Sequence, residues 1–336
     1  MHMADALLSP AVGVAMCAVS AGAMAYSSVK IKKDELSERK LPVMAVAGAF
    51  VFAAQMINFA IPGTGSSGHI GGGILLAALL GGFPAFLTVA AVFAIQALFF
   101  ADGGLLALGC NIFNLGVLPC LIVYPLIFKP LTKKGITVKN LSLASIASVI
   151  VGLQLGAFSV VLETLLSGIT ELPFSVFLVM MQPIHLAIGI AEGIITAAVL
   201  AFVYKLRPEI LESTSERREM GKTVSVKKAV IALAIITLVV GGGLSLFAST
   251  YPDGLEWSME KVAGTAELEA AGGIYDGAAA AQDAAAFMPD YAFKSDAENA
   301  AGTSVAGIIG SIVTFAIAGA IGIIIAWVKK KRKATV

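Results

Sequence analysis

Residues 229–249 read AVIALAIITLVVGGGLSLFAS, a stretch of 21 residues without a charged side chain. The hydrocarbon core of a bilayer is about 30 Å thick, and a helix needs about 20 apolar residues to cross it. Inside lipid the backbone must satisfy its own hydrogen bonds, which a helix does. This stretch therefore predicts a transmembrane helix.

The same pattern recurs through the chain. Further apolar stretches cover residues 7–29, 41–61, 70–83, 85–100, 105–128, 141–166, 180–204 and 304–328. We expect an all-α integral membrane protein, a polytopic helix bundle of about seven spans followed by a two-helix C-terminal unit. The stretch 70–83 is too short to cross alone, so we expect a re-entrant or tilted piece covered by protein. The composition agrees, because 58% of the 336 residues are hydrophobic and only 13% are charged.

The distribution of basic residues predicts the orientation. Of the 23 Lys and Arg residues, 21 lie in four segments, which are 30–40, 129–139, 205–228 and 329–333. Cytoplasmic connections are rich in Lys and Arg. We therefore expect the N-terminus outside and the C-terminus in the cytoplasm. No basic region precedes the apolar run at Leu7, so we expect no cleaved secretory signal. A net charge of only +1 argues for no nucleic-acid partner.

The chain divides into two predicted units. Residues 205–228 are expected to form a cytoplasmic linker between a unit at 1–204 and a smaller one at 229–336. The outside loop of the second unit, 250–303, is rich in alanine and holds ten acidic and two basic residues, but no His or Cys. This loop therefore offers poor ligands for a metal ion that prefers nitrogen or sulfur, such as Ni²⁺ or Co²⁺. The ends of this loop have the turn and apolar residues of a docking surface, so we expect the second unit to position the outer loops of the first.

The three histidines suggest a metal site. His2 follows the terminal amine, and His69 ends the glycine-rich loop 62–69. The Met1 amine, the His2 amide nitrogen and the His2 imidazole could form two fused chelate rings, and His69 could complete a plane of four nitrogens. Such a plane suits Ni(II) or Cu(II) rather than zinc. A histidine at position 2 is often without a role, however, and a loop of this kind is often only a turn.

The third histidine, His185, lies seven residues before Glu192 in a predicted span, so the two share a helix face. Ionisable groups inside a membrane are costly. The pair is either a proton relay or, as we favour, a set of hydrogen bonds that fixes helix packing.

The remaining sequence argues against an enzyme, because no nucleophile–base pair is evident. Gly221-Lys222-Thr223 resembles the end of a phosphate-binding loop, but Glu216 stands where that motif requires glycine. Any energy that the protein uses would therefore come from an ion gradient or from a partner protein.

Several stretches resemble a known family. Met1-His-Met-Ala-Asp-Ala-Leu-Leu-Ser-Pro10 is similar to the start of the cobalt/nickel-specific substrate-binding subunits, the CbiM/NikM type, of energy-coupling-factor (ECF) transporters. Similar stretches also lie at 55–69, 109–114 and 185–192. Pro252-Asp-Gly-Leu-Glu256 resembles the motif that names the PDGLE domain of the small N component, and 288–291 and 302–304 also fit. The order is that of a fused M–N chain.

The resemblance implies a function and a site. It implies a subunit that captures Ni²⁺ or Co²⁺ as its transported substrate in the plasma membrane of a prokaryotic cell. The implied metal ligands are the Met1 amine, the His2 amide and imidazole, and His69. It also implies a transmembrane coupling subunit of the T/Q type and cytoplasmic ATPase subunits as partners. The alternative is a stand-alone, proton-coupled secondary metal transporter with His185 and Glu192 as its relay.

Overall fold

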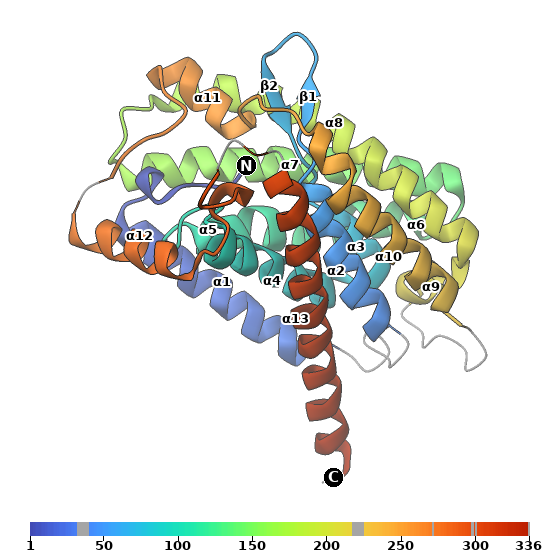
Figure 1. Cartoon of the computed structure of the whole chain (residues 1–336). Coiled ribbons are helices and arrows are strands. Elements are labelled where there is room, and N and C mark those ends of the chain that lie inside the picture. Colours follow the sequence, from blue (N-terminus) through green and yellow to red (C-terminus); the bar gives the residue numbers. More distant parts are fainter. Residues whose placement is uncertain (32–39, 217–224, 271, 297–298, 300, 335–336) are drawn as a thin grey trace.

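The computed structural model describes residues 1–336 except 32–39, 217–224, 271, 297–298, 300 and 335–336. The chain is almost wholly helical (Figure 1). The first part contains η1 (Asp5–Leu7), α1 (Pro10–Lys30), α2 (Leu41–Gln55), β1 (Phe59–Ile61), β2 (Ser66–Gly68), α3 (Gly73–Leu80), α4 (Gly82–Phe100), α5 (Leu108–Ile112), the π-helix η2 (Phe113–Phe128), α6 (Lys129–Thr132), α7 (Val138–Ser167), α8 (Phe174–Leu206) and α9 (Pro208–Ser215). The second contains α10 (Lys227–Gly242), η3 (Leu244–Phe247), α11 (Gly254–Ala263), α12 (Gly273–Ala285), η4 (Pro289–Tyr291) and α13 (Ala301–Ala334).

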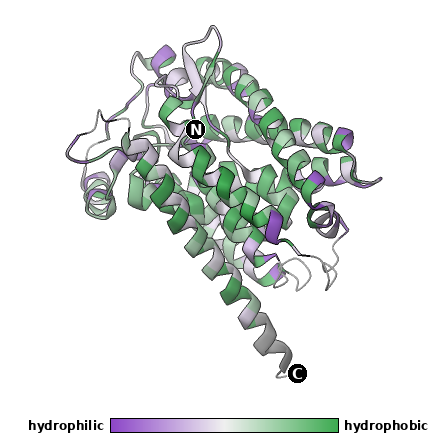
Figure 2. Ribbon diagram, turned by 45° about the vertical axis from the view of Figure 1, so that its right-hand side comes forward, coloured by the Kyte–Doolittle hydropathy of each residue, from purple (hydrophilic) through white to green (hydrophobic). Residues whose placement is uncertain are grey.

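The predicted class, an all-α polytopic membrane protein, is confirmed. Within the described residues, seven helical stretches are long and apolar enough to cross a bilayer, and α2 is a shorter apolar helix of 15 residues. The seven are Pro10–Lys30, Gly82–Phe100, Leu108–Thr132, Val138–Ser167, Phe174–Leu206, Lys227–Phe247 and Ala301–Val328. Hydrophobic residues dominate these helices, and hydrophilic residues gather toward their ends and in the connections (Figure 2).

One predicted helix is too long. The stretch 41–61 ends as helix at Gln55, and Phe59–Ile61 instead forms β1, which pairs antiparallel with β2. Pro62 supplies no backbone N–H, and Gly63 and Gly65 have φ angles of 76° and 74°. These residues favour a tight turn over a continued helix. A β-hairpin therefore stands where the sequence suggested the end of a span.

The short stretch 70–83 is a buried piece, as expected. Gly73–Leu80 forms a short helix whose eight residues are all buried, and Gly82 and Phe83 already belong to α4. The chain before α3 is not helical, and Gly72 there has a φ of 76° and lies where a Cβ would be 2.5 Å from Val51 Cγ1. The Glu192 carboxylate accepts the Gly72 N–H at 3.0 Å. This bond satisfies an amide that no helix pairs, and it supports the packing interpretation of Glu192.

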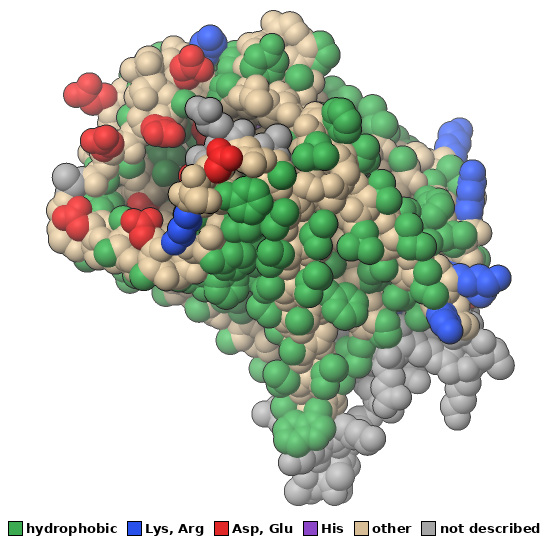
Figure 3. All heavy atoms as spheres, in the orientation of Figure 1, with side chains coloured by type: hydrophobic (Ala, Val, Ile, Leu, Met, Phe, Trp, Pro, Cys, Tyr) green, Lys and Arg blue, Asp and Glu red, His purple; other side chains and the backbone are tan. Residues whose placement is uncertain are grey.

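The second part of the chain packs against the first. Helix α13 lies along α2 and α10, and its lower end carries the C-terminus (Figure 1). Acidic side chains gather at the upper left of Figure 3, over the region of α11 and α12, whereas most visible Lys and Arg side chains lie at the right-hand edge. The basic stretches 32–39 and 217–224, with the loop-like Gly221-Lys222-Thr223, lie outside the described residues.

Candidate metal site

The first residues of the chain are held by α5 and by the connection that precedes it. The Met3 N–H donates to Asn111 Oδ1 at 2.7 Å, and Asn111 Nδ2 donates back to the Met3 carbonyl at 3.2 Å. The Gly104 N–H also donates to that carbonyl, at 3.0 Å. Asp5 Oδ1 accepts the Ala107 N–H at 2.9 Å. These bonds fix Met1 and His2 inside the protein rather than on a free terminus.

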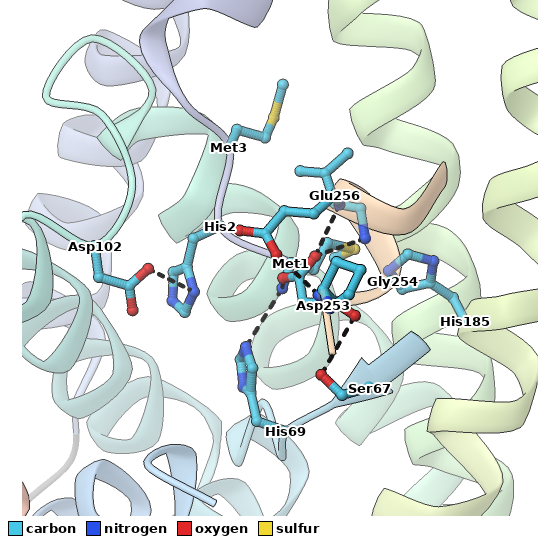
Figure 4. A network of polar contacts seen from close by, with 12 residues as sticks. Met1, His2, Met3, Ser67, His69, Asp102, His185, Asp253, Gly254 and Glu256 are labelled. Carbon is cyan, nitrogen blue, oxygen red and sulfur yellow. Dashed lines mark hydrogen bonds and ion pairs between the residues drawn. The ribbon is translucent and has the colours of Figure 1, made fainter. Parts of the chain in front are cut away.

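The three residues predicted from the sequence meet here. The Met1 amine lies 3.3 Å from His69 Nε2. The rings of His2 and His69 stack with their centroids 5.2 Å apart and their planes 15° from parallel. His69 follows β2 directly, and its Nδ1 lies 3.1 Å from the Ile70 carbonyl oxygen. Figure 4 shows the His2 ring reaching between Asp102 and His69.

Burial keeps both imidazoles neutral. Burial, together with the positive amine of Met1, lowers the pKa of His69 to about 3. Burial also lowers the pKa of His2, although Asp102 opposes the shift. His2 Nδ1 lies 3.2 Å from Asp102 Oδ1. Its Nε2 is buried, and no hydrogen-bond partner for it exists in the described part of the chain. A neutral imidazole is the form that binds a metal.

A fourth residue, Asp253, was missed as a site residue. The Met1 amine donates to Asp253 Oδ2, and the two form an ion pair. Burial alone would raise the pKa of Asp253, but the charge and hydrogen bond of the amine hold it below its usual range. Its other oxygen, Oδ1, caps α11 by accepting the N–H groups of Leu255 at 2.7 Å and Glu256 at 3.0 Å. Glu256 Oε2 accepts the Asp253 N–H at 2.9 Å, which completes a capping box.

The sequence carried one signal for this arrangement. Asp253 followed three residues later by Glu256 marks a helix start, and the sequence predicted a docking surface at this end of the loop. The partner could not be foreseen, because Met1 lies 252 positions away.

A cavity of about 470 Å³ adjoins these residues. Both His2 and His69 line it, together with four carboxylates, from Asp102, Asp253, Glu256 and Asp290. Nevertheless, no three His, Cys, Asp or Glu side chains among the described residues are placed as a metal cluster. Side chains alone therefore do not provide a ligand set here, and backbone nitrogens would have to contribute.

His185 lies on the side of Asp253 that is away from His2 (Figure 4). It lines a small cavity together with Met1, His69 and Asp253. Its Nδ1 lies 2.7 Å from the Met181 carbonyl oxygen of its own helix. His185 is therefore not paired with Glu192 as the sequence suggested. Glu192 instead accepts a hydrogen bond from the Gly72 N–H.

Comparison with known proteins identifies the family. Residues 2–210 match the family model CbiM, described as the cobalt uptake substrate-specific transmembrane region. The chain belongs to this family. Residues 227–327 match the PDGLE domain, so the chain joins the two in one polypeptide. The resemblance of the sequence to a fused M–N chain is thereby confirmed.

Several proteins that are similar to this chain are named as transport proteins. The chain is 29% identical over 317 residues to a protein of Archaeoglobus fulgidus named as a fused nickel transport protein, NikMN, covering 94% of this chain and 96% of that one. It is 32% identical over 232 residues to the fused nickel transport protein NikMN of Rhodobacter capsulatus, covering 63% and 64%. A crystal structure of a transition metal transporter superposes with a TM-score of 0.54 at 29% identity, covering 65% of this chain and 99% of the other.

Proposed function

We propose that this chain captures Ni²⁺ or Co²⁺ at the outer face of a prokaryotic plasma membrane and takes part in its import. The observation that carries the proposal is the meeting of the Met1 amine, His2 and His69 in one buried place. The transport names of the relatives support the same ions.

The proposed ligands are four nitrogens: the Met1 amine, the His2 amide, the His2 imidazole and the His69 imidazole. The amine and amide supply what the side chains lack. Loading requires a rearrangement, because the stacked rings of His2 and His69 present their faces to each other, whereas imidazole lone pairs lie in the ring plane. His2 Nδ1 must also turn from Asp102 toward the amine to close the chelate ring. A plane of nitrogens favours Ni²⁺ geometrically.

Orientation and energy belong to the same proposal. The acidic outer segment faces the outside and the basic connections face the cytoplasm, in line with the charge rule. Residues 1–204 form the metal-binding unit, 205–228 the linker and 229–336 the second unit. Transport is driven by separate partners, a transmembrane coupling subunit of the T/Q type and cytoplasmic ATPases, as in ECF systems.

The test is metal retention by purified protein from cells supplied with both ions. His2→Ala and His69→Ala should each lose the bound metal, because each removes a nitrogen ligand. His185→Gln serves as the matched control and should retain it. Loss of metal from the His185 variant alone would place the site deeper in the membrane and contradict the proposal.

A second variant tests the terminal amine. Residues added before Met1 convert its amine to an amide and should abolish tight binding, whereas the same extension at the C-terminus should not. Full stoichiometry in a folded, N-terminally extended protein would contradict the four-nitrogen site.

A further inference from the structure

The PDGLE segment, Tyr251–Glu256, lies against the hairpin that carries His69. The Ser67 N–H donates to the Pro252 carbonyl at 2.8 Å, and Ser67 Oγ donates to the Tyr251 carbonyl at 2.7 Å. Farther along, Trp257 Nε1 donates to the Thr64 carbonyl at 3.0 Å. The segment thus extends the edge of the hairpin only two residues before His69.

The other side of the segment is fitted closely to α8. A Cβ on Gly254 would lie 2.7 Å from Ile188 Cδ1 and 3.1 Å from His185 Nε2. Leu255 is 1% exposed. The PDGLE segment is therefore wedged between the hairpin and α8, and a side chain at position 254 would require Ile188 to shift.

From this wedged position Asp253 reaches the Met1 amine (Figure 4). One short segment thereby holds two nitrogen donors that come from opposite ends of the first 69 residues. It holds the amine through the Asp253 carboxylate and His69 through the hairpin bonds at Ser67.

We propose that Asp253 is a positioning residue of the metal site, and that the PDGLE segment completes a site whose nitrogen ligands all belong to the first unit. The inference rests on the function proposed above, and it assigns the PDGLE segment of the same chain as the part that positions the metal ligands. A chain terminus and a glycine-rich hairpin are costly to order. Contacts that order them before the ion arrives reduce what binding must supply. The carboxylate also places a negative charge beside a site for a dication.

The ligands lie within 1–204, but the affinity of that unit for metal depends on Asp253. The second unit does not supply a nitrogen, and its role is to hold the donors in place.

The test is the rate of Ni²⁺ release from the full chain to a chelator. Asp253→Asn keeps the size and the helix-capping ability of the side chain but removes the charge that pairs with the amine. We expect release at least about tenfold faster, as for other residues that orient metal ligands. Asp276→Asn, on the exposed side of α12, is the matched control and should release Ni²⁺ at the wild-type rate. An unchanged or slower release from Asp253→Asn would overturn the inference, and slower release would make Asp253 a competitor of the metal.

A second measurement needs no metal. A water-soluble amine-reactive reagent is applied to the metal-free proteins, and labelling of Met1 and Lys261 is followed by peptide mass spectrometry. Met1 should label faster in Asp253→Asn than in the wild type, whereas Lys261 should label equally in both. Equal labelling of Met1 would overturn the positioning role. Retention of metal by His69→Ala would instead overturn the proposed function, so the two failures are distinguishable.

Discussion

At the scale of single residues, burial decides which chemistry each group can offer. His2 and His69 are ordinary histidines in the sequence, and their positions alone predicted nitrogen ligands. The structure adds that burial lowers both pKa values, so neither imidazole holds a proton near neutral pH. A lone sequence does not reveal that a terminus is held inside the protein, because the groups that bond to Met3 lie about a hundred residues away, at Gly104 and Asn111.

These pKa values give the first prediction. Protons do not compete with the metal at the His69 imidazole until the pH falls far below 6.5, because its pKa in the folded protein is about 3. The four-nitrogen site instead displaces protons from the Met1 ammonium and the His2 amide. Binding should therefore release about two protons per metal ion, and affinity should fall as the pH is lowered. Calorimetric titration with Ni²⁺ in buffers of different ionisation enthalpy measures that number. Release of no protons would contradict the ligand set.

At the scale of elements, the apolar stretches predicted the long helices well and the irregular pieces poorly. Helices such as α7 and α8 are recognisable because length and hydrophobicity alone imply a span. The conformations of the hairpin and of the non-helical chain before α3 depend on local glycines and on hydrogen-bond partners that are distant in the sequence. Gly72 has a sharply positive φ, and its amide is satisfied by Glu192 on α8. Hydropathy reports neither of these facts.

The role of Glu192 leads to the second prediction. Glu192→Gln keeps an oxygen that can accept the Gly72 N–H, but it cannot exchange a proton. If the carboxylate serves packing, metal uptake by this variant should stay near the wild-type rate, whereas Glu192→Ala should lower the folded yield because the buried amide loses its partner. The measurements are uptake of radioactive ⁶³Ni and size-exclusion profiles in detergent. Abolished uptake in a well-folded Glu192→Gln protein would favour the proton relay.

At the scale of the whole molecule, two units that are far apart in the sequence meet where the Met1 amine pairs with Asp253. The sequence predicted their order and the boundary between them at 205–228, and this boundary stays a prediction. The contact between Asp253 and Met1 was beyond reach, because it joins the N-terminus to a capping box in the other unit. Fusion in one chain keeps that contact intramolecular, so the carboxylate is present at a high effective concentration.

The last prediction concerns the source of energy. A metal held by four nitrogens in a buried site leaves slowly, so import needs a step that opens the site against its affinity. The buried carboxylate of α8 already binds the Gly72 amide, which argues against a proton relay at that position. We therefore expect uptake to depend on the partner ATPases. In cells that produce this chain with its T/Q-type and ATPase partners, replacing the phosphate-loop lysine of the ATPases should stop ⁶³Ni uptake, because that lysine contacts the transferred phosphate. A protonophore should leave the initial rate unchanged while cellular ATP is maintained. Uptake that survives the lysine variant but collapses with the protonophore would establish the proton-coupled alternative instead.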